Sequence, residues 1–400
     1  MTESVQPRLE ALMVHAGQAM RSGRPREAVR LIEAAEAGLD AGAEAALRAV
    51  LRRNLGIALA AAGEREAGIA RLREALAADP EPELAHLNLA RLLLAKGERL
   101  EAARQGFRAL TRAQAKGRWR DAGSTPPGLR PLVLAVMDLV DAERRQLLDA
   151  LLRPFEEAHG RPALARIRAW LEAYLGHAPP APADPARKAR FLFLPGLAED
   201  RIHPRSRFPW IEALEARTGA IRAEALAACS EEARESFLHF GEGEDPGDYL
   251  GGAEPRWEAR FFYRDGRRFD SVHTACPTTS AAIEALPLVR IADHAPEICF
   301  SLLGPDTHIK PHHGVTNTRL VVHLPLVVPR DCALHVAGLT HAWREGEVLV
   351  FDDTWRHEAW NRSDRVRIIL LMDTWHPDLE PPEREALAAL VEGIGRFNRA

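Results

Sequence analysis

The sequence has few cysteines, no long apolar run and no excess of one charge, and each absence excludes a class of protein. Its cysteines, Cys229, Cys276, Cys299 and Cys332, are scattered without CxxC spacing. They predict reduced thiols in a cytoplasmic protein rather than a disulfide framework or a zinc site. No apolar stretch could cross a bilayer without burying charges, so we expect no membrane partner.

The charge balance and the length set further limits. The sequence contains 53 Lys and Arg against 57 Asp and Glu, a net charge of −4, so we expect no nucleic-acid partner. The opening MTESVQPRLEALM lacks the basic and apolar regions of a secretory signal, which again favours the cytoplasm. A chain of 400 residues has room for two or three domains.

The first third of the chain contains a repeat. NLGIALAAAGER, residues 54–65, aligns with NLARLLLAKGER, residues 88–99, at an offset of 88 − 54 = 34. This is the period of tetratricopeptide units, in which paired helices stack to bury their apolar faces. We therefore predict tetratricopeptide-like helical hairpins over residues 1–115. The apolar periodicity predicts additional helices over residues 116–175.

A proline-rich segment marks the domain boundary that we predict. Residues 176–188 begin with GHAPPAPADP, which is typical of an extended linker. Beyond it, residues 189–400 contain short apolar runs separated by Gly, Pro and Asp. We predict a strand at 191–197, a helix at 210–228, a hairpin at 257–269, further strands at 298–303, 318–328, 333–336, 348–351, 357–360 and 366–373, and a closing helix at 381–398. The fold class is thus multidomain α + β, ending in an antiparallel double sheet of jelly-roll type.

Histidines concentrate in this last part, where 10 of the 16 lie between His273 and His376. His312 and His357 each lie beside an apolar run, and Arg367 enters the last run ten residues after His357. Imidazole suits Fe(II), and a site with few protein ligands keeps coordination positions open. Arginine matches a carboxylate with two parallel hydrogen bonds. The pattern therefore predicts a redox metal beside an acidic co-substrate.

Three runs carry a family resemblance: SLLGPDTHIKPHHGVTNTRLVVHLPL at 301–326, WREGEVLVFDDTWRHEAWNRSDRVRIILLMDTWHP at 343–377, and CPTT at 276–279. In these runs the chain resembles the aspartyl/asparaginyl β-hydroxylases, which are Fe(II)- and 2-oxoglutarate-dependent oxygenases. Animal members of that family also carry helical repeats before the oxygenase domain.

The resemblance implies a double-stranded β-helix and an assignment of its site. His312 and His357 would be the iron ligands, and therefore the catalytic centre, with Fe(II), 2-oxoglutarate and O2 as cofactor and co-substrates. Gly314 stands where related oxygenases carry an acidic ligand, and in this family water fills that position. Arg367, helped by Ser301, would bind the distal carboxylate of 2-oxoglutarate, and His323 would lie near its metal-proximal carboxylate.

One position departs from the family pattern. Arg319 is retained, but Val321 stands where the animal enzymes carry a second arginine. Side chains at both positions point the same way on a strand. A pair of arginines that could bind acidic groups is therefore reduced to one arginine. We assign both residues to substrate binding and expect Asp-containing peptides to be poor substrates.

The resulting functional prediction is a dioxygenase that hydroxylates an aliphatic carbon. The substrate would be a peptide or protein side chain presented by the repeat region. Two alternatives stay open: a hydroxylase of a small molecule, such as an amino acid or an acyl chain, and a non-catalytic repeat scaffold with a decayed oxygenase domain. Asp352 and Asp353 are interpreted as shaping the turn before His357. His313 is expected to be a bystander. For His308, a structural role and a functional role are equally expected.

Overall fold

The structure is a computed structural model that describes residues 5–40, 43–178, 184, 186–238 and 245–399. The contacts within the chain divide it into two compact units, residues 1–149 with 396–400, and residues 150–395. Part of the predicted proline-rich linker, residues 179–183 and 185, lies outside the described residues. The domain boundaries drawn from the sequence therefore stay a prediction, and each unit is described by itself.

The first unit is built from helical hairpins, as the repeat predicted. Consecutive helices pack in pairs, α1 with α2, α3 with α4, and α5 with α6. Their bounds are α1 Val5–Arg21, α2 Pro25–Ala37, α3 Ala45–Ala61, α4 Arg65–Ala75, α5 Pro82–Lys96 and α6 Arg99–Ala115. Within α3 and α4, an ideal Cβ on Gly56 would lie 2.9 Å from the carbonyl oxygen of Gly68. Small residues are needed here because the two backbones nearly touch.

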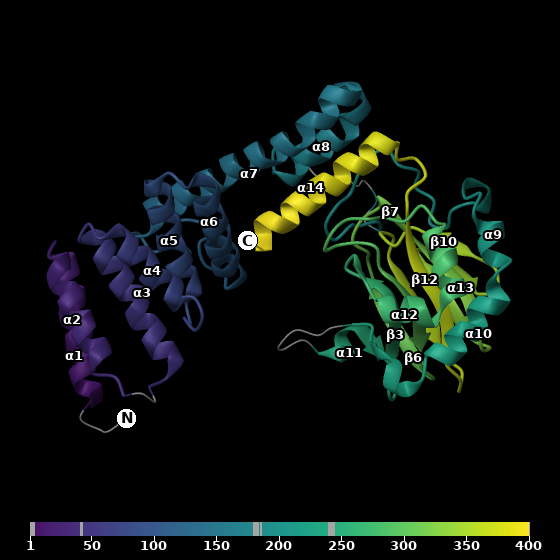
Figure 1. Cartoon of the computed structure of the whole chain (residues 1–400), viewed down its shortest axis with the longest axis horizontal. Helices are drawn as coiled ribbons and strands as arrows, with labels where there is room; N and C mark the ends of the chain where they lie inside the picture. Colours follow the sequence, from purple (N-terminus) through teal and green to yellow (C-terminus); the bar gives the residue numbers. More distant parts are fainter. Residues whose placement is uncertain (1–4, 41–42, 179–183, 185, 239–244, 400) are drawn as a thin grey trace. The chain divides into compact units, whose positions relative to one another are not determined.

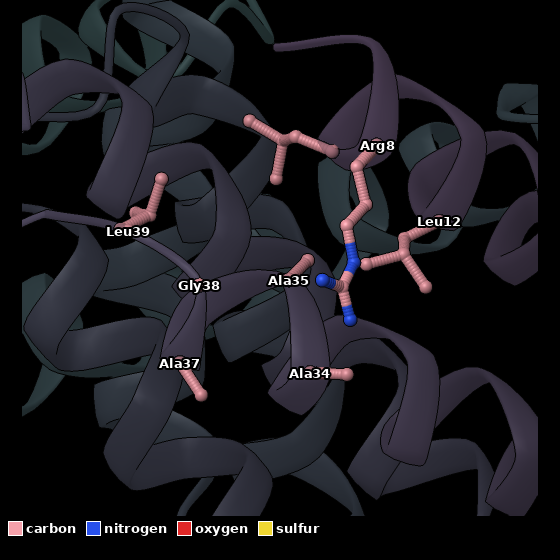
Figure 2. A pocket seen from close by; sticks show the side chains of 8 residues that line it. Arg8, Leu12, Ala34, Ala35, Ala37, Gly38 and Leu39 are labelled. Carbon is pink, nitrogen blue, oxygen red and sulfur yellow. The ribbon is translucent and has the colours of Figure 1, made fainter. Parts of the chain in front are cut away.

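A pocket of about 470 Å³ opens between α1 and α2, at the start of the helical unit. Figure 2 shows the Arg8 guanidinium beside the small and apolar side chains that line it. The lining is Arg8, Leu9, Leu12, Ala34, Ala35, Ala37, Gly38 and Leu39. It contains no histidine, cysteine or carboxylate, so this pocket has nothing to hold a metal, and the candidate site lies elsewhere.

Helices also belong to the second unit. Its members include the end of α7 (Arg130–His159), α8 (Ala165–Tyr174) and most of α14 (Pro381–Arg399). Arg166 on α8 donates to both carboxylate oxygens of the buried Glu383 on α14, with Nε to Oε1 at 2.9 Å and Nη2 to Oε2 at 2.5 Å. This bidentate pair ties a helix from before the predicted linker to the end of the chain.

Two antiparallel sheets form the core of the second unit (Figure 1). The first has the order β1-β3-β5-β12-β7-β10, with β4 beside β3, and the second has the order β2-β6-β11-β8-β9. The strands are β1 Glu235–Ser236, β2 Leu250–Gly251, β3 Trp257–Arg264, β4 Arg267–Arg268, β5 Ile298–Leu303, β6 Thr307–His312, β7 Arg319–Val327, β8 Cys332–Val336, β9 Leu339–Ala342, β10 Leu349–Phe351, β11 His357–Asn361 and β12 Arg367–Trp375.

The first sheet buries both of its faces. Alternate residues such as Leu324, Leu370 and Met372 pack under short helices that cover one face (Figure 1). These helices are α9 Ile211–Glu215, α10 Thr218–Ala228, α12 Asp270–Ala275 and α13 Pro277–Glu284. The short helix α11 (Pro246–Tyr249) instead contacts β2 and β6 of the second sheet. The opposite face, with Leu303 and Phe351, packs against Leu334 and Val336 of the second sheet. The predicted double-sheet fold is confirmed, and its interior is where side chains of both sheets meet.

Some predicted elements are wrong in detail. Residues 191–197 form no strand, because the Asn317 side chain bonds both backbone groups of Leu194, its Oδ1 accepting at 2.7 Å and its Nδ2 donating at 2.8 Å. The helix predicted at 210–228 is interrupted between α9 and α10. Strands β6 and β9 were not predicted. In β6, the exposed Pro311 and the half-buried Lys310 weaken the alternating pattern.

Candidate functional site

The two histidines predicted as ligands lie side by side inside the double sheet. His312 ends β6 and His357 begins β11, and the antiparallel register pairs them directly. Directly opposed residues share a face of the sheet. Their ring centroids are 4.1 Å apart. The second sheet thus brings together two imidazoles that are separated by 45 positions of sequence (357 − 312).

Each imidazole is oriented by its own strand. His312 Nδ1 lies 2.8 Å from the carbonyl oxygen of Lys310, and His357 Nδ1 lies 2.9 Å from that of Trp355. A carbonyl oxygen can only accept, so Nδ1 carries the proton and Nε2 keeps its lone pair. Metal-binding histidines are held in this way, by a carbonyl behind the ring.

Burial keeps both rings neutral. It lowers the pKa of His312, and it lowers the pKa of His357 to about 3, with the neighbouring His312 adding to the effect. Neutral imidazole is the form that ligates a metal. The donor set, two nitrogens with free lone pairs, therefore fits a first-row divalent metal that takes its other ligands from water or small molecules.

No third side chain completes a metal site: among the described residues, no group of three His, Cys, Asp or Glu is placed to hold an ion. Gly314, two residues after His312, could not be exchanged for an acid in this structure. A Cβ on Gly314 would overlap the carboxylate of Asp353. Burial raises the pKa of Asp353 to about 7, although the charge of Arg319 opposes this.

The two aspartates before His357 have different surroundings. Asp352 shapes the turn as expected, because its Oδ1 accepts from the backbone N–H of Thr354 at 2.8 Å and its Oδ2 binds Arg187. For Asp353, the buried Oδ1 has no hydrogen-bond partner. A turn-shaping role for the Asp353 side chain stays a prediction.

A row of ring contacts runs from the histidine pair to Arg367. Centroids are 5.5 Å apart for His357 and Phe351, 5.1 Å for Phe351 and His323, and 5.8 Å for His323 and Trp343. Arg367 Cζ then lies 5.1 Å from the centre of the Trp343 ring. Strands β10, β7 and β12 supply most of this row from the inner face of the first sheet. The sequence analysis did not single out Phe351 or Trp343.

Arg367 is a buried cation without a counter-ion. It is 2% exposed, and no carboxylate of the described residues forms an ion pair or a hydrogen bond with it. Burial lowers its pKa to about 10. Arg367 Nε, Trp343 Nε1 and His323 Nδ1 are all buried without a hydrogen-bond partner. A group of polar atoms that lack partners around a guanidinium is an arrangement that an anionic ligand would complete.

Ser301 lies on the same face as Arg367. It pairs with Ile369 across β5 and β12, two residues along from Arg367. Its Oγ accepts from Trp257 Nε1 at 3.0 Å, which leaves the hydroxyl proton to donate. His323 is kept neutral because burial and the charge of Arg367 both lower its pKa.

Arg319 and Val321, which were predicted to bind substrate, already contact other parts of the protein. Arg319 Nη1 lies 2.8 Å from Oδ2 of the buried Asp373, so its charge is already balanced inside the protein. Val321 is partly buried against the core between the two sheets. The register places both on the face that carries His323. The structure therefore brings Arg319 and Val321 towards the interior, where Asp373 already pairs with the charge of Arg319.

Comparisons with known proteins identify the family of the chain. A family model described as aspartyl/asparaginyl beta-hydroxylase matches residues 215–377. The Rhizobium tropici ornithine lipid ester-linked acyl 2-hydroxylase is 31% identical over 198 residues, covering 49% of this chain and 67% of that protein. The chain belongs to the aspartyl/asparaginyl β-hydroxylase family.

Other relatives of this β-hydroxylase family member match over shorter spans. The human aspartyl/asparaginyl beta-hydroxylase is 35% identical over 182 residues, which cover 45% of this chain. The match spans only 23% of the human protein. A Pseudomonas putida prolyl-4-hydroxylase structure, 15% identical, overlays on 42% of this chain and 98% of its own, with a TM-score of 0.24. The family is one of hydroxylases.

Two further histidines of this β-hydroxylase homologue, His308 and His313, bond partners outside the pair. His308 Nε2 binds Glu358 at 2.7 Å on the opposite face of the second sheet. His313 Nδ1 bonds the carbonyl oxygen of Thr354 at 2.9 Å, in keeping with its expected bystander role. Trp343 and Phe351 could have been found from the sequence only through the motif that they flank, because an aromatic residue beside a strand more often belongs to the core.

Proposed function

We propose that this protein is an Fe(II)- and 2-oxoglutarate-dependent dioxygenase that hydroxylates an aliphatic carbon. The observation that carries the proposal is Arg367, a buried guanidinium without an acidic partner, joined by a row of rings to two neutral histidines. A cation buried without a partner is costly, whereas an anionic co-substrate would neutralise it. His312 and His357 would hold the iron through Nε2.

Each residue has a definable task in that reaction. When bound, the iron would activate O2, one oxygen atom entering succinate as 2-oxoglutarate loses CO2 and the other replacing C–H by C–OH in the substrate. Arg367 and the Ser301 hydroxyl would bind the distal carboxylate, and Trp343 Nε1 is a further available donor. Leu303, Phe351 and Val336 would exclude water from the space between the sheets.

Two substrate classes are considered. A peptide or protein side chain, presented by the helical repeats, was expected from the domain order. An acyl chain is the second candidate, and one observation favours it. Asp373 already balances Arg319, and Val321 is apolar, so this side of the site offers no free charge to a polar substrate group. The Rhizobium tropici relative is named as an acyl 2-hydroxylase.

The proposal is tested by anaerobic titration of the full chain with Fe(II) and then with 2-oxoglutarate, followed by measurement of succinate in air. We expect His357→Ala to lose iron binding and Arg367→Met to lose 2-oxoglutarate binding. His335→Ala is the matched control, because its ring bonds Thr340 on the opposite face of the same sheet. A wild-type protein that binds no iron, or a control that loses iron equally, would exclude the proposal. The alternative of a non-catalytic repeat scaffold would then remain.

A further inference from the structure

Exposed apolar side chains surround the histidine end of the second sheet. Strand pairing sets His312 opposite His357, His357 opposite Val336, and Val336 opposite Leu339. Leu339 therefore lies on the same face of the sheet as the two histidines, one strand beyond Val336. Leu339 is nevertheless 46% exposed. It therefore forms an apolar edge on the β9 side of the site.

A second apolar edge lies on the other side of the pair. Val315 follows Gly314 directly, and the backbone N–H of Phe191 donates to its carbonyl oxygen at 3.0 Å. Phe191 is 38% exposed and Val315 39%. Large apolar side chains gain free energy when they leave water, so a cluster of exposed ones beside a site indicates a contact surface.

Basic side chains accompany these apolar edges. The N–H of Arg190 donates to the Gly314 carbonyl at 3.0 Å and that of Lys188 to the Thr354 carbonyl at 2.7 Å, while the Arg356 carbonyl accepts from Ala337 at 2.9 Å. All three side chains are exposed, and none forms an ion pair with a described residue. We call Lys188, Arg190, Phe191, Val315, Leu339 and Arg356 the rim.

The acidic side chains next to the rim do not cancel its charge. Asp352 and Glu199 both bind Arg187, at 2.8 Å and 3.0 Å. Asp184 is exposed and accepts from the backbone N–H of Ala186. The rim is thus basic in a chain whose net charge is −4. Exposed apolar groups mixed with free cations match a surface of anionic headgroups over acyl chains.

We propose that the rim docks the site on an anionic lipid surface, so that the oxidised carbon belongs to a lipid acyl chain. The proposal rests on the proposed hydroxylase function and names its substrate class. The sequence predicted no membrane partner because no segment could span a bilayer, and no helix of the described chain is long and apolar enough to do so. Docking at the surface needs no spanning segment.

Co-sedimentation of the full-length protein with lipid vesicles tests this proposal. We expect binding to vesicles containing phosphatidylglycerol and little binding to phosphatidylcholine alone. The triple variant Lys188→Glu/Arg190→Glu/Arg356→Glu should weaken binding on the order of 100-fold. The variant Phe191→Ser/Val315→Ser/Leu339→Ser should weaken it roughly tenfold or more. Thermal unfolding checks that each variant folds, and the single variant Leu339→Ser is the milder substitute.

Matched controls lie on α10 and just before it, where the covering helices face away from the rim. Leu226 is 58% exposed and Arg217 is exposed, so Leu226→Ser and Arg217→Glu change surface residues of the same kind. Equal loss in the controls, equal binding to both vesicle types, or capture of soluble anionic peptides without vesicle binding would overturn the proposal. Anaerobic iron and 2-oxoglutarate binding in the same preparation separates the two claims. If it persists while vesicle binding fails, only the lipid inference falls.

Discussion

Each unit of this protein pairs a buried arginine with an aspartate, but the second unit also buries an arginine that has no acidic partner among the described residues. In the helical unit, Arg53 Nη1 lies 2.7 Å from the buried Asp79. In the second unit, Arg187 has Asp352 at 2.8 Å, but Arg367, equally buried, has no acidic partner among the described residues. A protein that pairs its other buried arginines has the means to pair this one. The difference supports the proposal that an anionic ligand is the partner of Arg367.

The division into units can be tested by two fragments, which should give the largest effect. Residues 150–400 should fold and bind iron, whereas residues 176–400 should not. The shorter fragment lacks Arg166, the bidentate partner of the buried Glu383, and lacks Tyr174, whose ring contacts that of Phe191. Circular dichroism and iron titration compare them. A soluble, iron-binding 176–400 fragment would show that α8 is dispensable.

Removing a partner in the helical unit should unfold it readily. We expect Asp79→Ala to lower the free energy of unfolding by about 3–5 kcal/mol, because Arg53 would be left buried and unpaired. Urea titration followed by circular dichroism measures the change. Glu66→Ala, whose partner Lys96 is exposed, is the control and should change stability by under about 1 kcal/mol. Equal effects would contradict the buried-pair argument.

Arg367 should behave in the opposite way. Arg367→Met removes a buried charge that has no partner, so the ligand-free protein should be at least as stable as the wild type. Its 2-oxoglutarate affinity should nevertheless fall by about 3–5 kcal/mol. Thermal unfolding without ligand and calorimetric titration with 2-oxoglutarate measure the two effects. A destabilised apoprotein with intact 2-oxoglutarate binding would show that Arg367 is structural.

The glycine beside the first ligand should resist substitution. Gly314→Ala would place a methyl group on the Asp353 carboxylate, and we expect a loss of about 1–3 kcal/mol in stability together with weaker iron binding. Gly219→Ala is the control, since nothing lies within 4 Å of a Cβ there. Adding Asp353→Gly to Gly314→Ala should recover stability. Failure to recover would locate the strain elsewhere.

A pair of buried histidines outside the site should make stability depend on pH. The rings of His203 and His376 are 5.2 Å apart, and burial lowers the pKa of each to about 4. The unfolded chain takes up protons first, so this stability is present above pH 6.5 and is lost as pH falls towards 4. Between pH 7 and 5 we expect a loss of about 1–2 kcal/mol per histidine. Urea titrations of His376→Phe should show a weaker pH dependence, and an unchanged slope would contradict the assignment.

Periodic patterns were sufficient for much of the fold. The 34-residue repeat predicted the helical hairpins, and alternating apolar runs predicted most strands of the double sheet. Strands β6 and β9 were missed because little of their surface is apolar, and pairing with neighbours decides their conformation. The segment 191–197 was misjudged for the converse reason, since a distant Asn317 satisfies the backbone of an apolar run.

The sequence by itself determined the kinds of chemical group available: two histidines beside strands, an arginine in the last strand and a glycine where an acid is common. It could not show which charges are balanced, because ion pairs join residues that are distant along the chain. Only the folded structure pairs Arg319 with Asp373, leaves Arg367 without a partner and places Asp353 against Gly314. These differences matter energetically because the charged groups are buried. A charge removed from water must be neutralised within a few ångströms.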